Sequence, residues 1–197
     1  MPEIAAVILA AGLSERMGTA KLLLPLGNST VIGQFLARFP FALFQRVILV
    51  YHDEQIAAIA RAFPVILCQN DNPGAGISRS IHLGVSCTQS ENGLMFVVAD
   101  QPLLTGQTIS RLIDAFHTDQ HSIVLPGVNG NPANPVIFPA GLRLELLSLE
   151  GDSGGRQLIR RFPDLVRTVP CDSEHEFYDI DTPQLYQRVV KRWNLEN

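Results

Sequence analysis

The residues best suited to chemistry lie near the start of the chain, in a loop that follows an apolar run. The segment Leu9–Lys21 is rich in small residues and carries two cations, Arg16 and Lys21. Backbone N–H groups can approach phosphates closely in such a loop, where Gly12 has no Cβ and Ser14 can donate. The planar guanidinium suits phosphate oxygens, and the lysine can neutralise an α-phosphate under attack. The loop is therefore predicted to bind a triphosphate.

Two well-known glycine-rich nucleotide motifs are absent from this loop. It contains no G-x-G-x-x-G fingerprint of a dinucleotide site. It also differs from a P-loop, because five residues separate Gly12 from Gly18 and Lys21 comes three positions later. The alternative interpretation is a tight turn between a strand and a helix, with both cations in solvent.

Carboxylates suited to a metal ion occur in two further segments. Asp100 directly follows the apolar run Leu94–Ala99, and Pro102 then ends strand pairing. Ligands of open α/β sheets bind beyond the carboxyl ends of strands, and Mg²⁺ prefers hard oxygen ligands, so Asp100 is a candidate metal ligand. Asp179 and Asp181 alternate onto one side of their segment, and Asp181 is the favoured second ligand. The alternative is that these aspartates are helix N-caps or turn residues.

Two glycine-rich segments are candidates for the rest of the site. Segment 74–84 combines glycines with serines such as Ser80, which offers a wall of small residues for a base or a ribose. Gly84 within the expected helix indicates close packing at that position. Segment 151–156 places Arg156 at a helix start, where it is a candidate anion contact. The alternative for segment 151–156 is a simple surface loop.

The composition is that of a globular protein. The chain has 197 residues, of which 46% are apolar and 17% charged, enough for one three-layer domain. A net charge of −4 argues against a nucleic-acid partner, and no apolar run is long enough to span a bilayer. The three cysteines form no C-x-x-C pair, so we expect neither a disulfide framework nor a zinc site, and a cytoplasmic location.

Apolar runs alternate with amphipathic segments, and this βαβα rhythm positions the candidate residues. Most runs are continuously apolar, which is typical of strands covered on both faces. We predict a three-layer α/β/α, Rossmann-like fold with a mostly parallel sheet, in a single domain over residues 1–197. The expected strands are Ile4–Ala10, Arg46–Tyr51, Val65–Cys68, Leu94–Ala99, Ser122–Leu125, Pro135–Phe138 and Leu165–Val169. The expected helices are Thr30–Phe39, Glu54–Ala62, Gly76–Cys87, Thr105–Phe116, Arg143–Leu149, Gly155–Arg161 and Pro183–Arg192.

Other residues are predicted to serve the fold alone. Asp53 and Thr105 suit helix N-caps, and Pro183 suits a first helical turn. The phenylalanines of segment 35–44 are expected in the core. Trp193 is expected either to anchor the last helix or to be exposed.

With these motifs the chain resembles the MobA/MocA-like nucleotidyltransferases over nearly its whole length. The most specific match is Leu-Ala-Ala-Gly-x-Ser-x-Arg-Met-Gly-x-x-Lys, at Leu9–Lys21. Five further matches are the glycines and serine of segment 76–84, Asp100-x-Pro102, Gly-Asn-Pro…Pro-Val-x-Phe at 130–138, Gly-Asp-x-Gly-x-Arg at 151–156 and Asp-Ile-Asp-Thr-Pro at 179–183. Family members transfer a nucleoside monophosphate to molybdopterin, and the chain is most similar to the molybdenum cofactor cytidylyltransferase branch. The fold implied is that of the nucleotide-diphospho-sugar transferases.

The resemblance implies a role for each matching residue. The implied catalytic residues are Lys21, Arg16 and Asp100. The implied Mg²⁺ ligands are Asp100 and Asp181. The implied nucleotide-binding residues are Leu9, Ala10, Ala11, Gly12, Ser14, Gly76 and Ser80, within a part that spans about 1–104. The implied acceptor-binding residues are Asn134 and Arg156, within a part that spans about 105–197.

Three positions depart from the family pattern and leave the acceptor and the base open. Asn134 replaces a usual histidine, Arg79 replaces a small residue, and Gln184 replaces a frequent acid. The implied partners are CTP, a molybdopterin-type acceptor, and a molybdenum enzyme or its chaperone. The alternatives are a guanylyltransferase, a sugar- or polyol-phosphate nucleotidyltransferase, and a non-catalytic maturation factor that binds nucleotide or cofactor. An NAD-dependent oxidoreductase is disfavoured because the dinucleotide fingerprint is absent.

Overall fold

The computed structural model describes residues 3–196, so Met1, Pro2 and Asn197 of the expected domain lie outside the described residues. Its strands are β1 Ile4–Ala10, β2 Pro25–Leu26, β3 Ser29–Thr30, β4 Arg46–Tyr51, β5 Ile66–Gln69, β6 Gly93–Val98, β7 Ile123–Val128, β8 Asn131–Pro132, β9 Val136–Pro139 and β10 Val166–Pro170. Its α-helices are α1 Val31–Arg38, α2 Glu54–Ala60, α3 Ile77–Ser86, α4 Gly106–Thr118, α5 Arg143–Leu147, α6 Arg156–Arg161 and α7 Pro183–Glu196.

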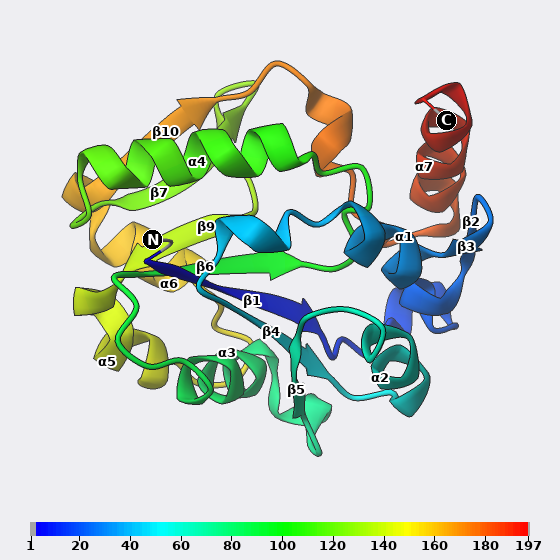
Figure 1. Cartoon of the computed structure of the whole chain (residues 1–197), viewed down its shortest axis with the longest axis horizontal. Helices are drawn as coiled ribbons and strands as arrows, with labels where there is room; N and C mark the ends of the chain where they lie inside the picture. The colour runs from blue at the N-terminus through cyan, green and yellow to red at the C-terminus, as the bar shows by residue number, and fades with distance from the viewer. Residues whose placement is uncertain (1–2, 197) are drawn as a thin grey trace.

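An eight-stranded sheet forms the centre of the structure, with helices on both faces (Figure 1). The main strand order is β10-β7-β9-β6-β1-β4-β5, and β8 pairs with β7. β1 pairs in parallel with β4 and β6, β4 with β5, and β7 with β10. β9 is antiparallel to both β6 and β7. The predicted three-layer α/β fold with a mostly parallel sheet is thus confirmed.

The two faces of β1 are buried in two separate hydrophobic clusters. Ile4, Ala6 and Ile8 pack in one cluster with residues of α1, α2, α4 and α7. Ala5 and Val7 pack in the other cluster with residues of α3, α5 and α6. Successive side chains of a strand point to opposite faces, so burial on both faces requires the continuous apolar run that the sequence shows.

Gly84 allows α3 to lie directly on β1. A Cβ at this position would lie 2.3 Å from Cγ1 of Val7, closer than two carbon atoms can approach without a shift. The close packing predicted for this glycine is confirmed. Because α3 is held against β1, its first residues lie beside the loop that follows the strand.

Several element boundaries differ from the sequence-based expectation. The hairpin of β2 and β3 was not predicted, since two-residue strands carry no measurable periodicity. Helix α2 ends at Ala60 instead of Ala62, and α7 continues to Glu196 beyond Arg192. Trp193 is buried, with the guanidinium carbon of Arg38 4.9 Å from its ring centroid, so it anchors α7.

The predicted N-caps are both present. The side chain of Thr105 accepts a hydrogen bond from the backbone N of Thr108 at 3.2 Å, and Asp53 accepts one from Gln55 at 2.8 Å. Strands from residues 1–104 and from residues 105–197 join the same sheet. Within residues 3–196, no helix is long and apolar enough to cross a membrane.

Candidate active site

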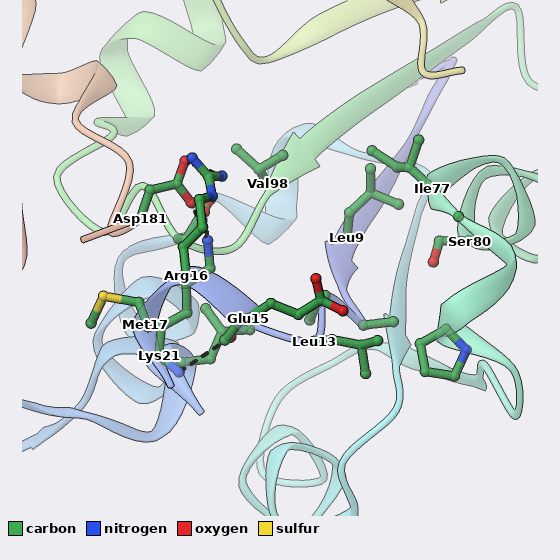
Figure 2. Close-up of a pocket in the computed structure, with 18 of the residues that line it drawn as sticks. Leu9, Leu13, Glu15, Arg16, Met17, Lys21, Ile77, Ser80, Val98 and Asp181 are labelled. Carbon is green, nitrogen blue, oxygen red and sulfur yellow. Dashed lines mark hydrogen bonds and ion pairs between the residues drawn. The ribbon is translucent and has the colours of Figure 1, made fainter. Parts of the chain in front are cut away.

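A cavity of about 450 Å³ opens at the carboxyl ends of β1 and β6 (Figure 2). The chain runs outward from β1 to β4 and β5, and then returns to β6 on the other side of β1. Ligands of open α/β sheets bind where the strand order reverses in this way. The cavity therefore lies where the topology predicts a ligand.

Most of the predicted site residues line this cavity, although they come from distant parts of the chain. Those that do are Leu9, Ala10, Ala11, Gly12, Ser14, Arg16, Lys21, Gly76, Ser80, Asp100 and Asp181. Asn134 and Arg156, predicted to bind the acceptor, are not among the lining residues. Asn134 precedes β9, which runs antiparallel to β6, so it lies at the same edge of the sheet as the cavity.

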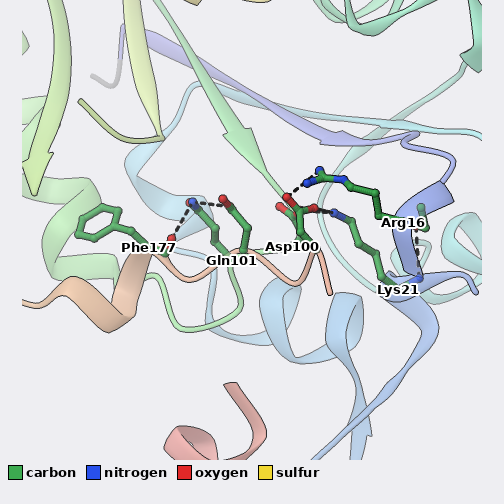
Figure 3. Close-up of polar contacts among 8 residues, drawn as sticks. Arg16, Lys21, Asp100, Gln101 and Phe177 are labelled. Carbon is green, nitrogen blue, oxygen red and sulfur yellow. Dashed lines mark hydrogen bonds and ion pairs between the residues drawn. The ribbon is translucent and has the colours of Figure 1, made fainter. Parts of the chain in front are cut away.

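One end of the cavity holds paired charges (Figure 3). Nζ of Lys21 donates to both Asp100 and Asp181, and its distance to Oδ1 of Asp181 is 2.7 Å. Nη2 of Arg16 lies 2.8 Å from Oδ2 of the same Asp181. The side chain of Lys21 is only 15% exposed, so the interpretation of this residue as a solvated surface cation is wrong. Arg16 also lines the cavity, and its side chain is 73% exposed.

The charges in this cluster stabilise one another. Burial would lower the pKa of Lys21, but the charges and hydrogen bonds of Asp100 and Asp181 outweigh it, and the pKa is raised. Burial would raise the pKa of Asp181, but its hydrogen bond to Lys21 and the charges of Lys21 and Arg16 lower it. Lys21 and Asp181 are therefore both ionised at neutral pH.

Backbone and side-chain contacts fix the two carboxylates relative to the sheet. The backbone N of Ile180 donates to the carbonyl of Asp100 at 3.1 Å, which holds segment 179–181 at the end of β6. Nε2 of Gln101 donates to Oδ1 of Asp179 at 2.8 Å, and Figure 3 shows its second contact, to the carbonyl of Phe177. Asp179 thus faces Gln101, whereas Asp181 faces the cations.

Neither Asp100 nor Asp181 caps a helix. The cap of α7 is Thr182, whose Oγ1 accepts from the backbone N of Leu185 at 3.2 Å. The cap of α4 is Thr105. The alternative interpretation of these aspartates as N-caps is wrong, and their carboxylates are available to the cavity.

The same two carboxylates fit a divalent cation. Nζ of Lys21 contacts both at once, which shows that one cation can lie between them. Among residues 3–196, no group of three or more His, Cys, Asp or Glu side chains could hold a metal ion. Oxygens from a substrate would have to complete the coordination, as is usual for Mg²⁺ held by one or two carboxylates and phosphates.

Two residues with positive φ shape the loop between β1 and Lys21. Ser14 has φ +55° and Gly18 has φ +64°, both in the left-handed region. Oγ of Ser14 also accepts from the backbone N of Lys21 at 3.4 Å. The two turns fold the loop back on itself, so that Arg16 and Lys21 reach the carboxylates beyond β6.

The other end of the cavity presents two exposed apolar side chains, a property that the sequence did not reveal. Leu13 and Ile77 line it and remain 49% and 38% exposed, and Leu9 and Val98 lie between them and the charged end (Figure 2). Large apolar side chains exposed in a cavity suit a flat ring. This end of the cavity, with Ser80 beside Ile77, is called the nucleoside end below.

Segment 151–156 contacts the residues that form the nucleoside end. The backbone N of Ser78 donates to the carbonyl of Gly151 at 3.1 Å. Gly76 has φ +91°, and a Cβ there would lie 2.3 Å from backbone atoms of Gly151, so only glycine fits. Asp152 lines the cavity, whereas Arg156 is exposed outside it.

A comparison with known protein families identifies the family of this chain. The model of the MobA-like NTP transferase domain matches residues 6–168. The chain therefore belongs to the MobA-like NTP transferase family, as the sequence motifs predicted, and it is a nucleotidyltransferase.

Individual relatives cover nearly the whole chain at modest identity. The chain is 26% identical to the molybdenum cofactor cytidylyltransferase of Escherichia coli, with 98% of each chain covered. It is 27% identical to the nicotine blue oxidoreductase of Paenarthrobacter nicotinovorans, over 96% of this chain and 98% of that one.

Solved structures support the same fold. A nucleotidyl transferase from Methanothermobacter has a TM-score of 0.83 at 21% identity, with 98% of this chain and 99% of that chain covered. A protein of Mycobacterium tuberculosis in complex with manganese has a TM-score of 0.76 at 25% identity, with 95% and 97% covered.

Proposed function

We propose that this protein transfers CMP from CTP to the terminal phosphate of a molybdopterin-type acceptor, with Mg²⁺, and releases pyrophosphate. The observation that carries the proposal is the ammonium group of Lys21, held by Asp100 and Asp181 at one end of the cavity, with Leu13 and Ile77 exposed at the other end. A nucleoside triphosphate has the same polarity, with a charged phosphate tail and a flat base.

The reaction exchanges one phosphoanhydride bond for another. An oxygen of the acceptor phosphate forms a bond to the α-phosphorus of CTP. The bond between that phosphorus and the oxygen bridging to the β-phosphate breaks, and pyrophosphate leaves with the electron pair. The nucleophile is already an anion, so no general base is required. The protein has to align two polyanions and to stabilise the charge that develops between them.

The residues of the charged end have complementary tasks in this reaction. Asp100 and Asp181 would hold Mg²⁺, which when bound would neutralise phosphate charge. Lys21 and Arg16 would then donate to phosphate oxygens, having exchanged their carboxylate partners for the substrate. The small residues of loop 9–14 leave room for backbone N–H groups to approach the phosphates.

Similarity to a cytidylyltransferase supports cytidine and the pterin acceptor, and the fold indicates where an acceptor would bind. The cytidylyltransferase of Escherichia coli matches over 98% of both chains, without large insertions or missing segments. Asn134, the implied acceptor-binding residue, lies at the cavity edge of the sheet. Arg156 follows a segment that contacts Gly76, so an acceptor would bind next to segment 151–156.

The test is a matrix of the four NTPs against molybdopterin, molybdenum-loaded cofactor and a set of sugar and polyol phosphates, with pyrophosphate release as readout. We expect release with CTP, Mg²⁺ and a molybdopterin-type acceptor. Preference for GTP would indicate a guanylyltransferase. Turnover only with a sugar or polyol phosphate would show that the acceptor is that phosphate and not a molybdopterin. Oxidation of NADH or NADPH without pyrophosphate release would contradict the proposal entirely.

A further inference from the structure

A fully buried amide, Asn70, lies behind the nucleoside end of the cavity. It follows β5, and its backbone N donates to the carbonyl of Tyr51 at 2.6 Å. Its own carbonyl lies 3.1 Å from Nδ1 of His52. Buried amides are retained where their hydrogen bonds are satisfied. Here the side chain meets the backbone N of Asn72 and Oγ of Ser80, each at 3.0 Å.

These two partners determine how the amide of Asn70 is oriented. The backbone N–H of Asn72 can only donate, so the atom that faces it must be the amide oxygen, Oδ1. The amide nitrogen, Nδ2, therefore faces Ser80. An amide nitrogen can only donate, so Oγ of Ser80 accepts this hydrogen bond.

The orientation of Asn70 leaves the hydroxyl hydrogen of Ser80 without a protein partner. Among residues 3–196, the hydrogen bonds of the structure include Oγ of Ser80 only as an acceptor. The side chain of Ser80 is buried apart from the surface that it contributes to the cavity. Its hydroxyl is thus held as a donor at the nucleoside end, which lies across the cavity from Asp181 (Figure 2).

We propose that Asn70 is a positioning residue for nucleobase recognition. It fixes the hydroxyl of Ser80 as a donor to an acceptor atom of the base, which in cytosine is the carbonyl oxygen or the ring nitrogen of its hydrogen-bonding edge. This inference rests on the proposed function, because it assumes that a nucleotide occupies the cavity. It adds a residue that does not line the cavity and that acts only through Ser80.

The variant Asn70→Asp tests this polarity. It keeps the size of the side chain but replaces the donor that faces Ser80 by an acceptor oxygen. The serine then donates to residue 70 and withdraws its hydrogen from the cavity. We expect the KM for CTP to rise about tenfold, the effect of one lost hydrogen bond, with kcat changed less than about twofold. Gln107→Glu, an exposed amide on α4, is the matched control and should leave both constants unchanged.

Combining Asn70→Asp with Ser80→Ala shows whether residue 70 acts by positioning Ser80 or by a general effect on the structure. Ser80→Ala alone should raise the KM for CTP as much as Asn70→Asp does. In that background, Asn70→Asp should have little further effect, since no hydroxyl remains to reorient. Equal effects of Asn70→Asp with and without Ser80 would overturn the inference. If Asn70→Asp does not fold, an unchanged KM in Ser80→Ala overturns it as well.

Binding of CTP without acceptor distinguishes this inference from the proposed function. The dissociation constant for CTP, measured by calorimetry on the full chain, should rise about tenfold in Asn70→Asp and in Ser80→Ala. That result together with no transfer to any acceptor would leave the inference standing and the proposed function wrong. If the wild-type protein transfers CMP but all variants have the same dissociation constant for CTP, the proposed function stands and the inference about Asn70 is wrong.

Discussion

At the residue scale, the central feature is a lysine whose ammonium group contacts two carboxylates. Lys21 joins Asp100 and Asp181, and Arg16 adds a second contact to Asp181. The same atoms that stabilise the free protein are those that a metal–triphosphate complex would engage. Substrate binding therefore has to replace existing ion pairs, which keeps the cations positioned before the substrate arrives.

Replacing Lys21 tests its role in charge stabilisation. In Lys21→Met we expect kcat to fall by about 10²–10³, the usual cost of removing one donor to developing charge. The fold should be retained, because the methionine stem still fills the space of the lysine stem. Steady-state pyrophosphate release and a thermal melt measure the two effects. Lys191→Met, at an exposed position of α7, is the control, and wild-type kcat in Lys21→Met would contradict the assigned role.

Asp179 predicts a pH dependence of stability. Burial and the charge of Asp100 raise its pKa from 3.8 to about 6, although the hydrogen bond from Gln101 opposes the rise. The ionised form is therefore disfavoured in the folded state. Ionised Asp179 therefore lowers the free energy of unfolding at pH values above about 6, the pKa of this group in the folded state. This destabilisation disappears as the pH falls from about 6 towards 3.8.

Asp179→Asn should accordingly stabilise the protein at pH 8 in metal-free buffer. An asparagine can still accept from Gln101, and its amide nitrogen can donate to Oε1 of Gln101, which is buried without a partner among the described residues. Urea unfolding at pH 8 and at pH 5 measures the effect. The gain should shrink at the lower pH, and an equal or larger gain at pH 5 would contradict the assignment.

At the element scale, contacts through glycine place α3 against β1 and so build the nucleoside end. Any side chain added at Gly84 should lower the free energy of unfolding. In Gly84→Ala the new methyl group meets Val7, and we expect a loss of about 1–3 kcal/mol in unfolding free energy. This occurs although alanine favours an exposed helix over glycine by about 1 kcal/mol.

A compensating change in Val7 identifies the cause of that loss. Val7→Ala removes the atom that Gly84→Ala would strike, so the double variant should lose less than the sum of the two single losses. Gly141→Ala has no atom within 4 Å of the added Cβ and is the matched control. Strict additivity of the two single variants, measured by chemical unfolding, would argue against the contact.

The sequence predicted most helices and strands, but it did not predict the direction of every strand or the pairing of the shortest strands. Continuous apolar runs identified β1 and β6, the strands that end at the cavity, because a strand buried on both faces is apolar along its length. The antiparallel direction of β9 was not predicted, since a short apolar run carries no information on direction. The hairpin of β2 and β3 depends on a turn at Gly27, with φ +57°, and has too few residues for a pattern.

At the scale of the whole molecule, the cavity joins segments from both halves of the chain. Asp100 was predictable at this edge because the carboxyl ends of parallel strands meet there. Asn70 was not predictable, because an asparagine in a turn-rich segment has the sequence signature of a loop. Its burial results from the packing of β4, β5 and α3 together. Leu13 and Ile77 were missed for the same reason, as their exposure in a cavity is a property of the assembled fold.

The contact of Gly151 with Gly76 connects the two parts that the sequence suggested, about 1–104 and about 105–197. In the proposed reaction, the nucleoside and the acceptor would therefore bind on either side of this contact. An acceptor that binds next to segment 151–156 would lie close to the bound nucleotide, as a direct transfer between them requires.

The most direct test of the account is to follow CMP itself. CTP labelled in the cytosine ring is incubated with the protein, Mg²⁺ and molybdopterin, and the acceptor is examined by mass spectrometry while pyrophosphate is quantified. The account predicts one cytidylylated acceptor for each pyrophosphate released, and a large loss of both products in Asp100→Asn. Pyrophosphate released without label on the acceptor, or equal product formation by Asp100→Asn, would contradict it.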